Sequence, residues 1–165
     1  MDQTHLHLLT NHVSMFALVF GALILVLGFM RKSEELKLGA AVLFVAGSIA
    51  FWPAFLTGEE AEHKVEEIAG VSHDDIEEHE EAAKWGRPFI IILGLVSAFG
   101  LFKFSKIKAI PKAISLTMLV LSLFTFTILA RTAYLGGYIR HSEIHQGAAA
   151  GAADDSGKAD DADNQ

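Results

Sequence analysis

The stretch Val13–Met30, VSMFALVFGALILVLGFM, holds 18 consecutive residues without a charge. Three similar uncharged runs follow it along the chain: Leu38–Gly58, Pro88–Phe102 and Ala113–Ala130. At a rise of about 1.5 Å per residue, about 20 apolar residues cross a hydrocarbon core that is about 30 Å thick. The third run is the shortest, and it reaches this length when Lys84 and Arg87 extend their charged ends to the membrane surface.

The composition agrees with a membrane protein whose charges are segregated from its apolar runs. Of 165 residues, 52% are hydrophobic and 20% are charged. A soluble protein with four buried apolar helices is the alternative, but the remaining polar chain is too short to cover them. The sequence therefore predicts an all-α integral membrane four-helix bundle over residues 1–146. We expect spans at these positions: about 12–30, 38–57, 86–103 and 113–135.

The basic residues predict how the bundle is oriented. The connections Arg31–Lys37 and Lys103–Lys112 together hold seven Lys and Arg residues, whereas the long connection Thr57–Arg87 is strongly acidic. Short loops rich in Lys and Arg stay in the cytoplasm. Both termini and the long loop are therefore expected outside. No basic segment precedes the first apolar run, so we expect no cleavable signal peptide and a first helix that stays in the membrane.

The long outer loop has the pattern of a short amphipathic helical hairpin. Its helices are expected at about 59–69 and 72–85, with a stop at Gly70 and an N-cap at Ser72 between them. In the second helix, His79 falls on the stripe that should face the membrane domain. The acidic, alanine- and glycine-rich tail 147–165 is expected to be disordered.

All eight histidines lie on the predicted outer side, in three sequence groups: His5, His7 and His12; His63, His73 and His79; and His141 and His145. Imidazoles at a membrane interface are suited to hold haem iron, copper or zinc. The chain has no cysteine, which excludes thiolate metal sites and cysteine-ligated iron–sulfur clusters. The outer face is therefore the place to look for a cofactor.

The first helix predicts which N-terminal side chains point inward. Ser14, Gly21 and Gly28 recur at heptad spacing, and small residues let helices approach closely in lipid. His7 and Asn11 continue this face, so we expect both to point into the bundle. His12 lies on a different side of the helix from that face. A polar helix start at the interface is the plainer explanation of these residues.

The C-terminal pair His141 and His145 has i, i+4 spacing, which places both on one face for metal binding where the chain is helical. Glu59 directly follows Thr57 and Gly58. It is explained by its favourable position at a helix start, and it is also a candidate oxygen ligand or counter-ion.

Arg131 is predicted just inside the outer boundary of the hydrocarbon. An ionisable side chain there usually faces a partner or a cavity. We expect it to pair with Glu59 or Glu60, or with a haem propionate, and to share a polar stripe of the fourth helix with Thr117 and Thr127. The alternative is an arginine that only extends to the membrane surface.

Four segments together resemble a known family. They are listed in chain order: His7…Asn11-His12, Thr57-Gly58-Glu59, Glu78-His79-Glu80-Glu81-Ala82, and Gly136-Gly137-Tyr138-Ile139-Arg140-His141-Ser142-Glu143-Ile144. Over about residues 4–145 the chain resembles a bacterial family of small four-span membrane proteins catalogued as domain of unknown function 2231. Relatives usually have His-Phe-Pro where this chain has His12-Val13-Ser14. The resemblance implies a multi-pass protein of the bacterial cytoplasmic (inner) membrane and mildly favours a redox role. It supplies no catalytic residues.

Three functions remain open from the sequence. The first is a protein of the electron-transfer or accessory respiratory kind that binds haem b, with candidate residues His7, His12, His79, His141 and Arg131. The second is a non-haem copper, zinc or iron site, with candidate ligands His7, His12, His79, His141, His145 and Glu59. The third is a structural or accessory subunit without a cofactor. The chain has no catalytic motif, so an enzyme is not expected. The expected partners are the lipid bilayer and a redox or other membrane protein, with no nucleic acid.

Overall fold

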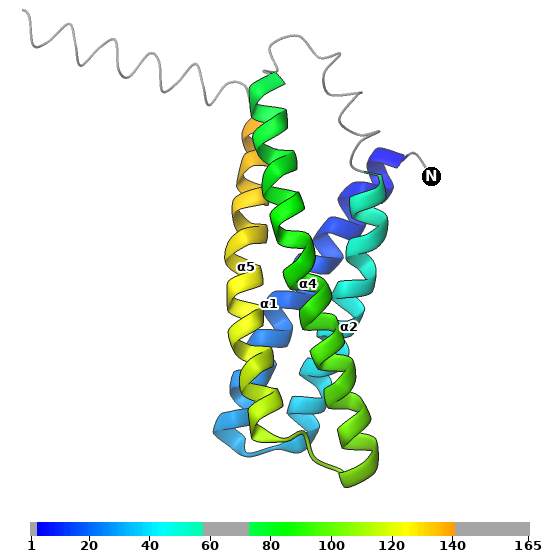
Figure 1. Cartoon of the computed structure of the whole chain (residues 1–165), viewed down its shortest axis with the longest axis vertical. Coiled ribbons are helices and arrows are strands. Elements are labelled where there is room, and N and C mark those ends of the chain that lie inside the picture. The colour runs from blue at the N-terminus through cyan, green and yellow to red at the C-terminus, as the bar shows by residue number, and fades with distance from the viewer. Residues whose placement is uncertain (1–2, 58–72, 141–165) are drawn as a thin grey trace, which may run out of the picture.

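The protein is an all-α four-helix bundle. A computed structural model describes residues 3–57 and 73–140, and Figure 1 shows its helices: α1 (Gln3–Arg31), α2 (Glu34–Leu56), α4 (His73–Ile107) and α5 (Lys112–Arg140). Each of them is long and apolar enough to cross a membrane. The prediction of a multi-pass membrane bundle is confirmed. The expected outer helix 59–69 and the tail 147–165 lie outside the described residues.

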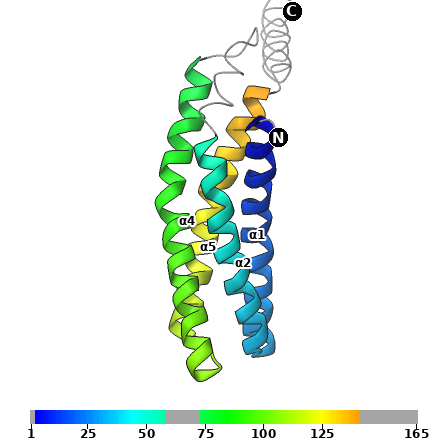
Figure 2. The same cartoon turned by 90° about the vertical axis from the view of Figure 1, so that its right-hand side faces the viewer.

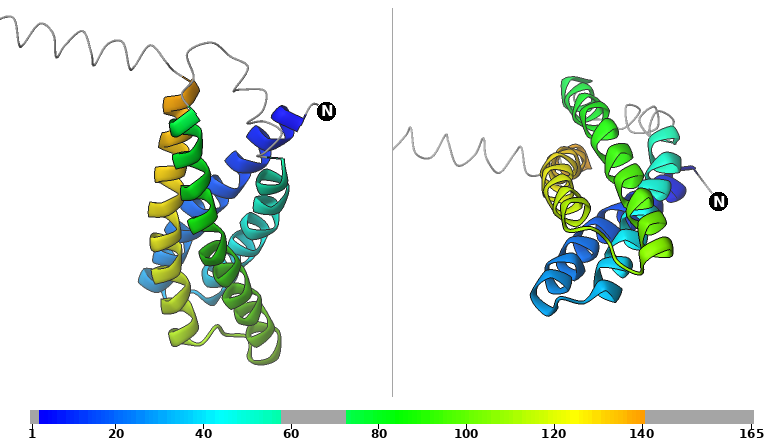
Figure 3. Two further views of the ribbon diagram at one scale, coloured as in Figure 1. Left: turned by 45° about the horizontal axis from the view of Figure 1, so that its top comes forward. Right: turned by 60° about the horizontal axis from the view of Figure 1, so that its bottom comes forward.

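The helices pack as two pairs, α1 with α2 and α4 with α5, and α2 also contacts α4 while α1 contacts α5. Figure 2 shows the pairs as two layers, and in Figure 3 one pair crosses the other at an angle. The start of α1, the end of α2, the start of α4 and the end of α5 meet at one end, which we call the histidine end (Figure 1). The opposite end carries the short connections 32–33 and 108–111, and we call it the basic end.

Small residues bring α1 and α2 into close contact, as the heptad pattern predicts. Ser14 is buried, and a Cβ atom added at Gly21 would lie 2.6 Å from Cε1 of Phe44. Gly21 therefore leaves room for the ring of Phe44, and van der Waals packing of this kind is a main source of helix association in lipid. The prediction for Asn11 is wrong, because its side chain is exposed. Asn11 is rotated by about 40° from His7 at 100° per residue, which takes it off the contact face.

The predicted break between an outer helix 72–85 and a span 86–103 is also wrong. The structure has one continuous 35-residue helix, α4, with Pro88 inside it. Gly86 is buried, and a Cβ atom there would lie 2.9 Å from Cδ2 of Leu129, so tight packing on α5 holds the helix through this segment. The second helix of the predicted hairpin is therefore part of the same helix as the third span.

Aromatic and basic side chains mark where the bilayer lies. Trp52, Trp85 and Tyr134 are exposed on the helices near the histidine end, as expected of an interfacial belt. The 22 residues from Trp85 to Lys106 span about 32 Å along α4, which matches the thickness of the hydrocarbon core. The part of α4 before Trp85, which includes His79, therefore extends beyond that core.

Buried hydroxyls line the interior of the bundle. Five hydroxyl side chains are at most 2% exposed: Ser14, Ser97, Ser115, Ser122 and Thr125. Thr117, Thr127 and Arg131, which were predicted to form a polar stripe on the fourth helix, are all exposed. Each of the two threonine hydroxyls donates to a carbonyl of its own helix, four residues back, at 3.0 Å. That bond satisfies the hydroxyl on a lipid-facing surface without any inward partner.

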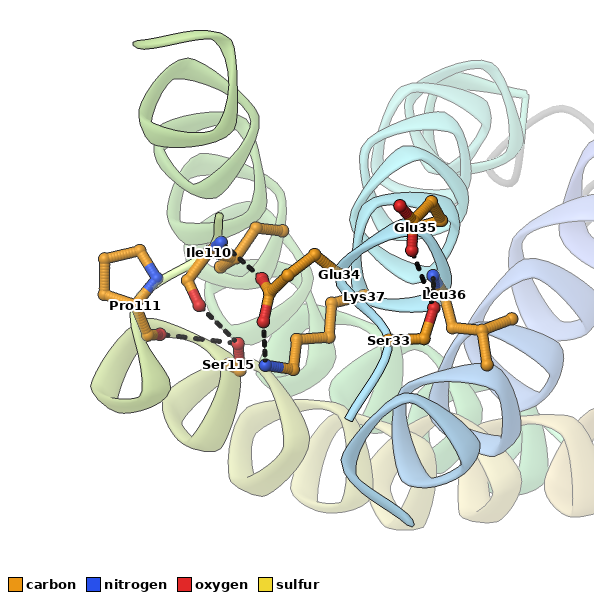
Figure 4. Close-up of polar contacts among 8 residues, drawn as sticks. All are labelled: Ser33, Glu34, Glu35, Leu36, Lys37, Ile110, Pro111 and Ser115. Carbon is orange, nitrogen blue, oxygen red and sulfur yellow. Dashed lines mark hydrogen bonds and ion pairs between the residues drawn. The ribbon is translucent and has the colours of Figure 1, made fainter. Parts of the chain in front are cut away.

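The basic end is held together by a pair of charged residues that were not singled out in the sequence (Figure 4). Lys37 is buried, and its Nζ donates to Oε1 of Glu34 at 2.6 Å. Oε2 of Glu34 accepts a hydrogen bond from the backbone N–H of Ile110 at 2.8 Å. This carboxylate therefore ties the start of α2 to the connection that leads into α5.

Candidate functional site

His7 lies in the first turns of α1, beside the last turn of α2. Its Nδ1 is 2.7 Å from the backbone oxygen of Ala54. A carbonyl oxygen only accepts hydrogen bonds, so Nδ1 carries the proton and donates it. In the neutral ring, Nε2 then has an unprotonated lone pair. The bond also satisfies one of the carbonyls that the end of α2 leaves without a helical partner.

His79 makes the same kind of contact between α4 and α5. Its Nδ1 is 2.9 Å from the backbone oxygen of Thr132 and therefore donates to it. The ring lies against Gly136, where an added Cβ atom would be 3.0 Å from Cε1 of the imidazole. The prediction that His79 faces the membrane domain is confirmed. Its Nε2, like that of His7, keeps an unprotonated lone pair in the neutral ring.

The two imidazoles come from different helix pairs, yet they lie at the same end of the bundle. A histidine that binds a metal typically donates one ring N–H to a carbonyl or carboxylate, which fixes the tautomer and presents the other nitrogen. His7 and His79 both have this arrangement, with Nε2 as the nitrogen that is presented.

Arg131 pairs with Glu78. Its Nη2 is 2.7 Å from Oε1 of Glu78, and the side chains of the two residues are 66% and 52% exposed. The predicted partners, Glu59 and Glu60, lie outside the described residues. The neighbour of α5 at this end is α4, which explains why the acid comes from α4. Because Glu78 precedes His79 and Arg131 precedes Thr132, the ion pair and the imidazole contact cross-link α4 and α5 side by side.

The other candidate residues do not join this site in the part of the chain that is described. His12 is exposed, with its ring 6.3 Å from the ring of Phe16 on the same helix. His141, His145 and Glu59 lie outside the described residues. Within residues 3–57 and 73–140, no group of three or more His, Cys, Asp or Glu side chains is placed to hold a metal ion. The described site therefore consists of two imidazoles.

Comparison of the chain with models of protein families, with curated proteins and with solved structures gave no match. The resemblance to the four-span family stays a prediction from the sequence.

A small interior pocket lies toward the middle of the bundle. It is lined by residues of α1, α2 and α4, among them Ser14, Phe44 and Ile90, and it has essentially no room for a water-sized molecule. This pocket is therefore too small for a haem macrocycle.

The sequence indicated His7 and His79, but it did not predict the hydrogen bonds that fix the two rings. Their hydrogen-bond acceptors are backbone oxygens, which leave no side-chain pattern to read. Gly136 did leave a signal. Glycine inside a helix costs about 1 kcal/mol relative to alanine, so its presence there indicates a close contact. The Gly136-Gly137 pair could have indicated that a bulky side chain from another helix lies against α5.

Proposed function

We propose that this protein binds a transition metal through His7 and His79 at the outer end of its bundle, and serves a membrane redox system in electron transfer or as an accessory subunit. The observation that supports it most is the shared geometry of the two rings. Each imidazole donates Nδ1–H to a backbone oxygen, which leaves Nε2 as the nitrogen with a lone pair in the neutral ring. Imidazole nitrogen suits zinc, copper, iron and nickel.

A metal ion suits this site better than a haem group. Two imidazoles satisfy the axial positions of haem iron, but the macrocycle also needs an enclosed slot and a cation for its propionates. The interior pocket is too small, and Arg131, the expected propionate partner, already binds Glu78. Two Nε2 atoms can hold an ion while water or a redox partner supplies the remaining ligands.

The proposed orientation places the basic end in the cytoplasm, and the membrane is the bacterial inner membrane. It rests on the seven basic residues of the connections Arg31–Lys37 and Lys103–Lys112. Reporter fusions after Gln165 test it. An extracytoplasmic reporter should be active at that position, and activity of a cytoplasmic reporter instead would reverse the orientation.

The metal site is tested by variants that keep a hydrogen-bond donor at the position of Nδ1 but remove Nε2. The amide nitrogen of asparagine occupies nearly the position of Nδ1, so His7→Asn and His79→Asn keep the donor to the backbone oxygen and remove Nε2. Elemental analysis and reduced-minus-oxidised spectra of detergent-purified protein should show bound metal in the parent and its loss in both variants. His12→Asn is the matched control on the exposed face of α1, and it should retain the metal. A parent protein that binds no metal would overturn the proposal.

A structural role for the histidines is the second candidate. It is favoured by the bond from His7 to Ala54, which caps the end of α2. In that case asparagine at either position should leave the melting temperature nearly unchanged, and alanine should lower it, with no metal in any variant. The same set of proteins therefore distinguishes the two functions.

A further inference from the structure

The basic end exposes a surplus of positive charge. Six basic side chains there are exposed or half-buried: Arg31, Lys32, Lys103, Lys106, Lys108 and Lys112. Of the two acids in the described part of this end, Glu34 is bound to Lys37 and Ile110, and Glu35 is exposed beside Ser33. Most of this charge is therefore available to a partner outside the bundle.

Two of these lysines lie on a defined apolar surface of α4. Nζ of Lys103 is 5.3 Å from the centroid of the Phe99 ring, and Nζ of Lys106 is 5.7 Å from that of Phe102. The two rings stack on each other at 6.5 Å, with an angle of 23° between their planes. We call these four residues the lysine–phenylalanine strip.

The strip lies where the hydrocarbon of the bilayer meets the headgroups. Phe99 and Phe102 are 49% and 54% exposed on a helix that crosses the membrane, so their rings face lipid. Lys106 lies about 32 Å from Trp85 along α4, one membrane thickness from the aromatic belt. A molecule bound here meets two ammonium groups at its polar end and two aromatic rings at its apolar end.

We propose that the lysine–phenylalanine strip binds an anionic phospholipid from the adjacent leaflet. The phosphate lies between the ammonium groups of Lys103 and Lys106, and an acyl chain lies along Phe99 and Phe102. Each basic residue near a membrane surface contributes about 1 kcal/mol of attraction to anionic lipid. Zwitterionic lipids lack the net negative charge that complements two ammonium groups. This interaction is independent of the metal site at the other end.

Thermal unfolding of the full chain in detergent, with added lipid, tests the proposal. Phosphatidylglycerol should raise the melting temperature of the parent more than the same concentration of phosphatidylcholine. The double variant Lys103→Gln/Lys106→Gln should lose at least half of the phosphatidylglycerol shift, while Lys103→Arg/Lys106→Arg should keep it. Lys32→Gln, at the same end but in the connection between α1 and α2, is the matched control and should also keep it.

Two results would overturn the proposal. One is an equal shift with the two lipids. The other is a phosphatidylglycerol shift in the glutamine double variant that matches the parent. Native mass spectrometry of the parent provides a measurement that needs no variant: phosphatidylglycerol should remain bound in preference to phosphatidylcholine, and equal retention would contradict the specific site.

Discussion

The two ends of the bundle each contain an ion pair, and the pairs differ in almost every respect. At the basic end, Lys37 and Glu34 are 11% and 30% exposed, and they belong to the same helix. At the histidine end, Arg131 and Glu78 are 66% and 52% exposed, and they join two helices. The first pair is shielded from solvent and the second is not.

The difference extends to the polar atoms around each pair. At the basic end, both carboxylate oxygens of Glu34 have partners, one of them a backbone N–H from another segment. At the histidine end, each imidazole bonds a backbone oxygen of another helix through Nδ1. The carboxylate of Glu34 therefore ties a helix start to a connection at the basic end, whereas the imidazoles at the histidine end join helices in pairs.

The largest expected effect is at the basic end. Glu34→Ala leaves the buried Lys37 ammonium without its partner and the Ile110 N–H without its acceptor. Removing one member of a buried pair should lower the free energy of unfolding by about 3 kcal/mol. Thermal unfolding in detergent measures this loss. Glu35→Ala, at an exposed neighbouring position, should be nearly silent, and equal losses from the two variants would remove the contrast between the ends.

The next effect concerns the close contact of His79 with α5. Gly136→Ala places a methyl group 3.0 Å from the imidazole, and overpacking of this kind costs about 1–3 kcal/mol. The variant should also weaken metal binding, because the ring must move. Gly137 has no atom within 4 Å of an added Cβ, so Gly137→Ala should raise stability by about 0.5–1 kcal/mol through helix propensity. Melting temperatures that move in the same direction would refute the close contact.

A smaller effect is expected for Arg131. The sequence placed Arg131 just inside the hydrocarbon boundary with a partner, but the observed pair with Glu78 is exposed, and exposed pairs contribute about 0.2–1 kcal/mol. A double-mutant cycle of Arg131→Ala and Glu78→Ala should give a coupling energy in that range, decreasing with added salt. A coupling energy near that of the Glu34–Lys37 pair would show that the two ends are equally shielded.

The smallest effect is expected midway between the ends, on α5. Thr125 is fully buried, and its hydroxyl forms no hydrogen bond within the described chain. Thr125→Val should therefore leave stability unchanged or raise it by up to about 1 kcal/mol, since an unpaired buried hydroxyl is lost. The exposed Thr127 is the matched control, and its valine variant should be neutral. A loss of more than about 1 kcal/mol at Thr125 would show that its hydroxyl has a partner.

Features of the fold that follow from local sequence patterns could be predicted, whereas features that depend on contacts between distant segments could not. The four spans followed from uncharged runs, and the inward positions of His7 and His79 followed from helical periodicity. The continuity of α4 did not, because the segments 72–85 and 86–103 were expected as separate elements and the contact of Gly86 with Leu129 leaves no pattern in the sequence.

The partners of charged groups were harder to predict, because they depend on which helices are neighbours. Glu59 and Glu60 were chosen for Arg131 on the assumption that the end of α2 lies beside α5. The contacts of α5 are with α4 and α1, which brings Glu78 to Arg131. Lys37 was interpreted only as a topology signal. Its bond to Glu34 is local, whereas the bond between Glu34 and the backbone N–H of Ile110 joins positions 76 apart in the chain.

The continuity of α4 also has a mechanical consequence. The helix runs without a joint from His79, past Trp85, to Lys103 and Lys106. Membrane helices adapt to bilayer thickness by tilting, and when a continuous helix tilts its two ends move in opposite directions. His79 moves with α4, whereas His7 moves with α1. A change in bilayer thickness that tilts α4 relative to α1 therefore changes the distance between the two imidazoles.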